Sequence, residues 1–257
     1  MQPLQECRNR SRIHNLRRTH MLKSLNNAPI GVPLILVAVT ETHLAEELRQ
    51  MGIFEGSRLA RLDEEVLMQP LKIRGPKADV VLGSGMAAKI IVHLEDGRRI
   101  PVVEMRPREQ GHLEGTIGGP ALLHTMDVLG LRRNDTIVLL RQLPPMEYIA
   151  VIEKKQRIHV TEALAAKIWG TIDKSTMQFV AAQSGKTFHV LDLLGGQHSR
   201  QVLNSYGIHV GSSLILERVA QAQSVIIDHS HPLIISTHDG LRMLLSEHQG
   251  RHIFIKE

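Results

Sequence analysis

HLAEELRQMGIFEGS, residues 43–57, is a short amphipathic segment that ends in a glycine-bounded turn, and the chain carries the same pattern twice more. The two other stretches are ALLHTMDVLGLRRND at 121–135 and HSRQVLNSYGIHVGS at 198–212. Successive copies are 78 and 77 residues apart, measured at the shared glycines Gly52, Gly130 and Gly207. A fixed spacing of this length is the signature of an internal structural repeat.

A second landmark keeps the same two separations. It is formed by GMAAKI at 85–90, ALAAKI at 163–168 and GLRMLL at 240–245. The pairs Gly118-Gly119 and Gly195-Gly196 are again 77 residues apart. We therefore interpret the chain as one module written three times.

Each copy predicts a short helix that stops at its glycine. Apolar residues recur at i, i+3, i+4 or i+7 and form a buried stripe; they are Leu44, Leu48 and Met51, then Leu122, Met126 and Leu129, then Val202, Leu203 and Tyr206. The glycine suits the left-handed position that ends a helix. Four residues later a second position tolerant of positive φ predicts a tight turn, at Gly56, Asn134 and Gly211.

Short β-type runs follow each turn. They are Ser57–Leu62, Leu71–Arg74, Asp79–Leu82 and Ile90–Val92, then Thr136–Leu140, Tyr148–Glu153 and Arg157–Val160, then Ser213–Glu217, Ser224–Asp228 and Leu233–Ser236. The last run of each copy meets a predicted helix cap at Ser84, Thr161 or Asp239. We expect a mainly β chain of three tandem small barrels, each with one or two short helices, because closure removes exposed edges.

The expected organisation is a basic, disordered tail at 1–25 and modules at 26–105, 106–174 and 175–257. The tail carries Arg8, Arg10, Arg12, Arg17, Arg18 and Lys23 against Glu6, which accounts for the whole net charge of +5. Such a tail predicts at most weak binding to nucleic acid or anionic lipid.

Composition narrows the class of protein. Aromatic residues are only 3% of the chain, so we expect the cores to be aliphatic. Cys7 is the only cysteine, which excludes an intrachain disulfide. The longest apolar run, 32–39, is far shorter than the ~20 residues of a membrane span. No secretory signal is visible, and these points favour a cytoplasmic protein.

The first copy resembles a FeoA domain, the SH3-like barrel of the ferrous iron transport protein A family. The resemblance covers most of residues 25–95, from LNNAPIGVPLILVAV through EELRQMGIFEGSRL to PLKIRGPKADVVLGSGMAAKIIV. Its matching positions are Leu48, Met51, Gly52, Ile53, Gly56, Ala87, Ala88, Ile90 and Val92. Similar barrels end the iron- and manganese-dependent transcription repressors. In the later copies Asn134 replaces the second glycine and Arg242-Met243 replaces the alanine pair.

The resemblance implies a non-enzymatic accessory or regulatory protein of ferrous iron transport or metal homeostasis. It would act as a protein–protein interaction module, and the family partner would be the membrane ferrous iron transporter FeoB. FeoA domains usually occur singly, and they carry a Leu-Arg pair where this chain has Leu82-Gly83. That departure puts in doubt any partner contact made by the arginine.

Histidines suggest an alternative function, transition-metal binding or metal-responsive regulation through the third copy. His229 and His231 alternate along one predicted strand and share a face, and His238 lies just beyond. Imidazole ligands suit Fe²⁺, Zn²⁺ or Mn²⁺. Surface or turn histidines are the competing interpretation, and no metal is required by the pattern.

The sequence contains no nucleophile–base pattern, and no carboxylate pair stands apart from the ordinary surface charge. We therefore expect that the protein is not an enzyme. Gly185-Lys186-Thr187 ends like a phosphate-binding loop, but Val180 stands where that motif needs glycine. We interpret the stretch as a turn. A nucleic-acid role would rest on the tail alone, because no helix-turn-helix pattern is present.

Overall fold

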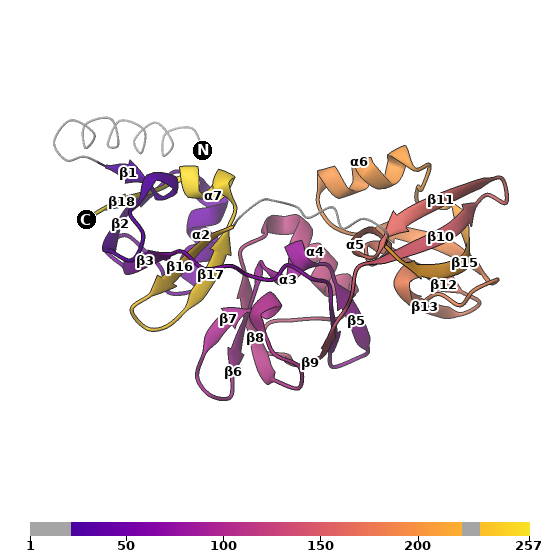
Figure 1. Cartoon of the computed structure of the whole chain (residues 1–257), viewed down its shortest axis with the longest axis horizontal. Coiled ribbons are helices and arrows are strands. Elements are labelled where there is room, and N and C mark those ends of the chain that lie inside the picture. Colours follow the sequence, from indigo (N-terminus) through magenta and orange to yellow (C-terminus); the bar gives the residue numbers. More distant parts are fainter. Residues whose placement is uncertain (1–21, 223–231) are drawn as a thin grey trace, which may run out of the picture.

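The computed structural model describes residues 22–222 and 232–257, which form three six-stranded antiparallel sheets. We name the units by position: the terminal unit holds both ends of the described chain, and the central unit lies between it and the distal unit (Figure 1). The fold is therefore mainly β, as predicted.

The three sheets share one strand order. In the terminal unit it is β1 (Lys23–Ser24), β18 (Ile253–Lys256), β2 (Pro33–Val39), β3 (Arg58–Leu62), β16 (Leu233–Thr237) and β17 (Arg242–Leu245). In the central unit it is β7 (Arg99–Pro101), β6 (Ile90–Leu94), β8 (Gln110–Thr116), β9 (Thr136–Gln142), β4 (Leu71–Arg74) and β5 (Asp79–Leu82). In the distal unit it is β13 (Ser175–Gln178), β12 (Ile168–Ile172), β14 (Thr187–Leu193), β15 (Ser213–Gln221), β10 (Met146–Ile152) and β11 (Gln156–Thr161).

Each unit also carries three short helices at matching places. A 3₁₀ turn follows the first edge strand, a longer helix follows the third strand, and a short helix precedes the second strand. They are η1 (Leu25–Asn27), α2 (Thr42–Gln50) and α7 (Glu247–Arg251), then η2 (Val102–Glu104), α4 (Gly119–Val128) and α3 (Ser84–Ala87), then η3 (Phe179–Ala181), α6 (Gln197–Ser205) and α5 (Glu162–Ala165).

The sheets do not follow the expected modules 26–105, 106–174 and 175–257. Every module is divided at a connection, and its second half pairs with strands of a different module. The first half of the first module completes its sheet with the end of the chain, through β3 with β16 and β2 with β18. The periodic pattern fixes which residues form strands, but the three copies are alike, so it does not fix which copy supplies the partner.

One connection gives a local reason for this exchange. β9 and β10 are joined by Leu143, Pro144 and Pro145 alone. Two consecutive prolines hold an extended backbone and disfavour a tight hairpin, so the chain runs on into the distal unit. Leu143 is buried and its N–H donates to the Pro70 carbonyl (2.8 Å), which ties this connection to the one that precedes β4.

The glycine that ends each longer helix has the predicted conformation. Gly52, Gly130 and Gly207 have φ of 84°, 70° and 79°. The next residue donates its N–H to the carbonyl five residues earlier, at 2.9, 2.8 and 3.1 Å, in the pairs Ile53–Leu48, Leu131–Met126 and Ile208–Leu203. The three glycines therefore lie in the same local surroundings.

The second turn position is also confirmed. Gly56, Asn134 and Gly211 have φ of 95°, 69° and 92°. Their N–H groups donate to strand carbonyls at 2.8, 2.7 and 2.9 Å, in the pairs Gly56–Leu36, Asn134–Leu113 and Gly211–Val190. Each turn is thereby fixed to the strand that precedes its helix.

In the third copy the structure differs from the predicted alignment. Residues 242–245 form β17, and Asp239 lies in the turn between β16 and β17 and does not cap a helix. The equivalent short helix is α7, which Ser246 caps with Gln249 in a reciprocal capping box. The long connection 222–232 causes the error, because it moves this helix beyond the 77-residue spacing. The predicted run 224–228 lies outside the described residues.

The start of the chain also differs from the expectation. Residues 23–25 were assigned to the tail, but β1 pairs with β18 and Leu25 is fully buried in the terminal unit. Burial of one leucine is invisible in a segment dominated by charge. The rest of the tail lies outside the described residues.

The aliphatic cores continue across the junctions between units. Ile91 and Ile117 of the central unit are buried in the core of the terminal unit. Ile234 and Leu244 of the terminal unit and Leu194 of the distal unit are buried in the core of the central unit. Units that share buried apolar residues cannot separate without exposing them to water.

We predict that Gly52→Ala lowers the free energy of unfolding by about 1–2 kcal/mol, because alanine is strained at positive φ. An added Cβ would meet no atom within 4 Å, so strain is the only cost. Gly85 in α3 also has open space, but its φ is not positive, and Gly85→Ala is the control. Denaturant titration should find the control neutral or more stable by up to about 1 kcal/mol. Equal losses in both variants would contradict the assignment.

Candidate functional site

Side-chain hydrogen bonds join neighbouring units at both junctions of the described chain. At the junction of the terminal and central units, Arg99 of β7 donates to Glu114 (2.5 Å), to Asp239 (2.7 Å) and to the Met51 carbonyl (3.0 Å). Asp239 and Met51 belong to the terminal unit. Hydrogen bonding to Glu114 raises the pKa of Arg99, so the guanidinium remains charged.

Further contacts fasten the same junction. Arg242 of β17 donates to Glu104 of the central unit (2.8 Å). Gly119 at the start of α4 donates its N–H to Glu47 of α2 (2.6 Å). Burial raises the pKa of Glu47, and the Gly119 N–H opposes that shift.

The junction of the central and distal units is built on a buried amide. Gln178 is only 4% exposed. Its Oε1 accepts from the Val81 N–H (2.9 Å), and its Nε2 donates to the carbonyls of Val81 (2.8 Å) and Ala166 (2.6 Å). One side chain thus satisfies the backbone of edge strand β5, which would otherwise lack a partner at that point.

Two helices also meet at this junction. Gly195, just before α6, donates its N–H to Thr125 Oγ1 of α4 (2.9 Å). His124 lies 2.8 Å from Asp192. The two contacts fix the start of α6 beside α4.

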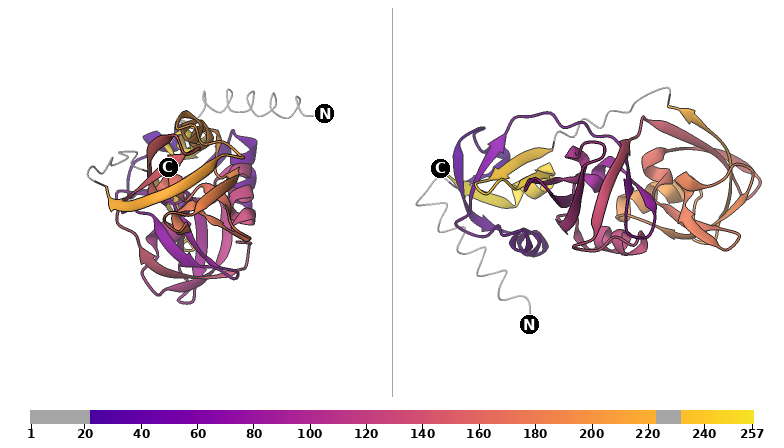
Figure 2. Two further views of the ribbon diagram at one scale, coloured as in Figure 1. Left: turned by 90° about the vertical axis from the view of Figure 1, so that its right-hand side faces the viewer. Right: turned by 90° about the horizontal axis from the view of Figure 1, so that it is seen from below.

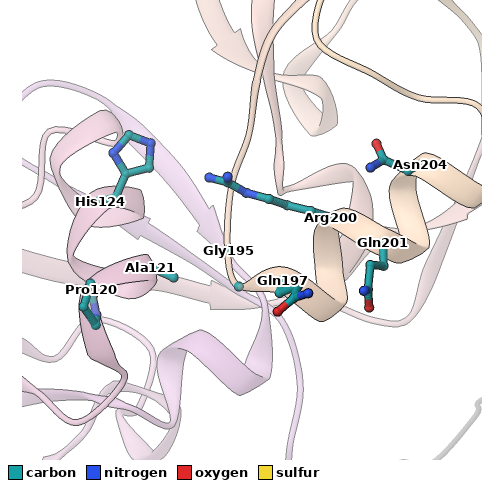
Figure 3. Close-up of a pocket in the computed structure, with 9 residues that line it drawn as sticks. Pro120, Ala121, His124, Gly195, Gln197, Arg200, Gln201 and Asn204 are labelled. Atoms are coloured by element: carbon teal, nitrogen blue, oxygen red, sulfur yellow. The ribbon is translucent and has the colours of Figure 1, made fainter. Parts of the chain in front are cut away.

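A cleft of about 520 Å³ opens between these helices. It is lined by Pro120, Ala121 and His124 of the central unit and by Gly195, Gly196, Gln197, Arg200, Gln201 and Asn204 of the distal unit. Arg200 extends from α6 toward the side on which His124 lies (Figure 3), and its Nε donates to the Leu193 carbonyl (3.0 Å). Its polar side chains are His124, Gln197, Arg200, Gln201 and Asn204, and none of them is suited to act as a nucleophile.

A smaller cleft of about 240 Å³ lies at the other junction. Its charged and imidazole groups are Glu41, His43, Glu47, Lys89 and His248. Acidic and basic side chains are mixed, so the cleft favours no single charge. Lys167, which occupies in the distal unit the place of Lys89, donates instead to Ser199 (2.7 Å), and burial lowers its pKa.

Of the three predicted metal ligands, only His238 lies in the part of the chain that the structure describes, so the metal site stays a prediction. His238 is exposed in the turn between β16 and β17, and His229 and His231 lie outside the described residues. Within 22–222 and 232–257, no three His, Cys, Asp or Glu side chains are grouped to hold a metal ion. Two imidazole pairs, His93–His112 and His248–His252, have ring centroids 4.9 Å apart, but each is a pair only.

A buried carboxyl group was not predicted from the sequence. Glu162 of α5 is 4% exposed, and its Oε2 has no hydrogen-bond partner. Burial raises its pKa to about 7, against the opposing effects of the Arg141 charge and of hydrogen bonding with Tyr148. Burial likewise raises the pKa of Tyr148 to about 12.

The predicted turn at Gly185-Lys186-Thr187 is confirmed. Gly185 has φ of 80° and donates its N–H to the Leu216 carbonyl (2.9 Å), directly before β14. None of the helices in the described part of the chain is long and apolar enough to span a membrane.

The described fold is that of small, mainly β units packed in a row, with an open cleft at each junction. Residues 23–94 match the family model of the FeoA domain. The matched range runs from β1 to β6 and so spans the terminal and central units. No curated protein and no solved structure matches the chain.

We predict that Arg99→Ala lowers the free energy of unfolding by about 2–3 kcal/mol, because it leaves Glu114 half-buried without its cation. Arg98 is the matched control. It is more exposed and bonds Asp96 and Glu109 within the central unit, so Arg98→Ala should cost at most about 0.5 kcal/mol. Denaturant titration of both variants measures the difference, and equal costs would show that the junction does not depend on Arg99.

We predict that the Glu162 carboxyl lowers the free energy of unfolding as the pH rises from about 5 to 8. The pKa of the Glu162 carboxyl is about 7 in the folded chain, against 4.5 for a glutamate that is free in water. The folded state therefore holds a proton that the unfolded state releases in this range. Glu162→Gln should match the native chain at pH 4 and exceed it by about 2–3 kcal/mol at pH 8.

Glu247, exposed at the corresponding place in α7, is the control for this measurement. Glu247→Gln should keep the native slope of stability against pH. A native slope that persists in Glu162→Gln would assign the pH dependence to another group.

Proposed function

We propose that the chain is a non-enzymatic accessory or regulatory protein of ferrous iron transport that works in the cytoplasm by docking to the membrane transporter FeoB. The observation that carries the proposal is the FeoA-domain match at residues 23–94. The residues that line the two junction clefts are not arranged for proton or acyl transfer, so the clefts give no support to an enzymatic role.

We further propose that all three units are FeoA-like and that each sheet curls into a small SH3-like barrel. Two observations support this. The strand order is the same in all three sheets. Their helix-ending glycines make the same hydrogen bonds.

The docking element that we propose is the turn after α2, within the matched range. Phe54 projects from it and is 60% exposed. Its N–H donates to Ser57 Oγ (3.0 Å), which fixes the turn. Equivalent bonds run from the Arg132 N–H to Asp135 Oδ2 (2.6 Å) and from the His209 N–H to Ser212 Oγ (3.1 Å). Arg132 and His209 therefore stand at the position of Phe54 in the other two units, and both are polar. An exposed aromatic side chain on a rigid turn is a typical anchor of protein interfaces.

The test measures ferrous iron uptake in a strain without this protein and co-purification of the tagged chain with FeoB. We expect uptake to fall in the deletion strain. Phe54→Ala should weaken co-purification at least tenfold, since loss of an anchor typically costs about 2 kcal/mol. Arg132→Ala changes the equivalent turn of the central unit and should bind as the native chain does. Unchanged uptake together with no co-purification would reject the proposal.

A further inference from the structure

The terminal unit is assembled from the two ends of the described chain. Residues 22–62 supply β1, β2 and β3, and residues 232–257 supply β16, β17 and β18. β18 lies between β1 and β2, and β16 pairs with β3. The C-terminal segment is thus inserted into the sheet and does not merely cover it.

The N-terminal half of the unit is incomplete without this segment. Leu25, Leu34, Leu36, Leu48 and Leu59 are buried in a core that the C-terminal segment closes. The segment contributes its own fully or almost fully buried side chains, Ile235, Leu241, Met243, Leu245, Ile253 and Ile255. Removing it would expose an apolar groove, would leave β1 without the strand β18 that pairs with it, and would leave one edge of β3 unpaired.

The connection that brings the segment into place differs from the other two. Residues 63–70 and 143–145 each join neighbouring units, whereas residues 222–232 join the distal unit to the terminal unit. The central unit lies between those two units in Figure 1 and in the right-hand view of Figure 2. These eleven residues, which span at most about 36–40 Å, therefore join two units that are not neighbours in the row.

We propose that a second copy of this chain can supply residues 232–257, so that two chains interlock by exchanging their C-terminal segments. The occupant of the groove is the same in the closed monomer and in the exchanged dimer. Every contact of the terminal unit is kept, and only the path of the connection and the entropy of association differ. This inference goes beyond the proposed role in iron transport and does not rest on it.

The register of β3 and β16 provides a direct test. Ala60 and Ser236 are opposite each other in this strand pair, at a separation that suits a disulfide. Both variants carry Cys7→Ser, because Cys7 is the only native cysteine. One tagged chain carries Ala60→Cys and a second, differently tagged chain carries Ser236→Cys. They are unfolded, mixed, refolded together and oxidised.

We expect a covalent heterodimer on a non-reducing gel, in a fraction that rises with protein concentration during refolding. A closed monomer cannot form it, because the residue that faces the single cysteine within the same chain is then the native Ser236 or Ala60. The control mixture replaces Ser236→Cys by Ser175→Cys, at the edge of the distal unit, and measures random cross-linking. Light scattering of the refolded native chain should show the corresponding dimer.

A heterodimer yield no greater than that of the Ser175→Cys control would overturn the proposal, provided that a chain with both Ala60→Cys and Ser236→Cys forms its internal disulfide. Disulfide formation in that double variant shows that residues 60 and 236 face each other across the pair of β3 and β16. All readouts are masses of the full chain, so they are independent of iron uptake and of any transporter.

Discussion

Pairing between strands of different repeats is the constraint on which this structure depends. β4 pairs with β9, β10 with β15, and β16 with β3, and each pair joins the second half of one sequence copy to the first half of another. A strand within a sheet needs partners for its N–H and C=O groups on both edges. No sequence copy can therefore complete its sheet alone in this arrangement, and the chain is stabilised as a whole.

The left-handed turns make such an exchange possible without loss of local structure. The strand before the helix, the helix, its glycine and the second turn form one segment. Hydrogen bonds within this segment hold it together, at Gly52 and Gly56 and at their counterparts. This segment lies entirely in the first half of each sequence copy. The second half is a hairpin followed by a short helix and a strand. Both halves keep their internal geometry whichever partner they meet, so the exchange changes connectivity and not packing.

The sequence predicts the local elements well because their signals are local. The positive φ at Gly130 and Asn134 and the strands around them follow from residue type and spacing. The exchange of halves does not, since three similar copies offer equivalent partners. Single buried polar groups are also hidden: Gln178 and Glu162 are ordinary residues in the sequence, and their roles depend on strands that lie 97 and 14 residues away, at Val81 and Tyr148. Spacing alone cannot reveal them.

Differences among the copies then follow from their places in the row. Glu47, Thr125 and Val202 stand five residues before the three helix-ending glycines and are equivalent. Glu47 accepts the N–H of Gly119 from the next unit, and Thr125 accepts that of Gly195 from the unit after it. Val202 belongs to the distal unit, and its side chain carries no hydrogen-bonding group. Among these three equivalent positions, a polar acceptor thus stands at the two that bond the backbone at the start of the next unit's helix.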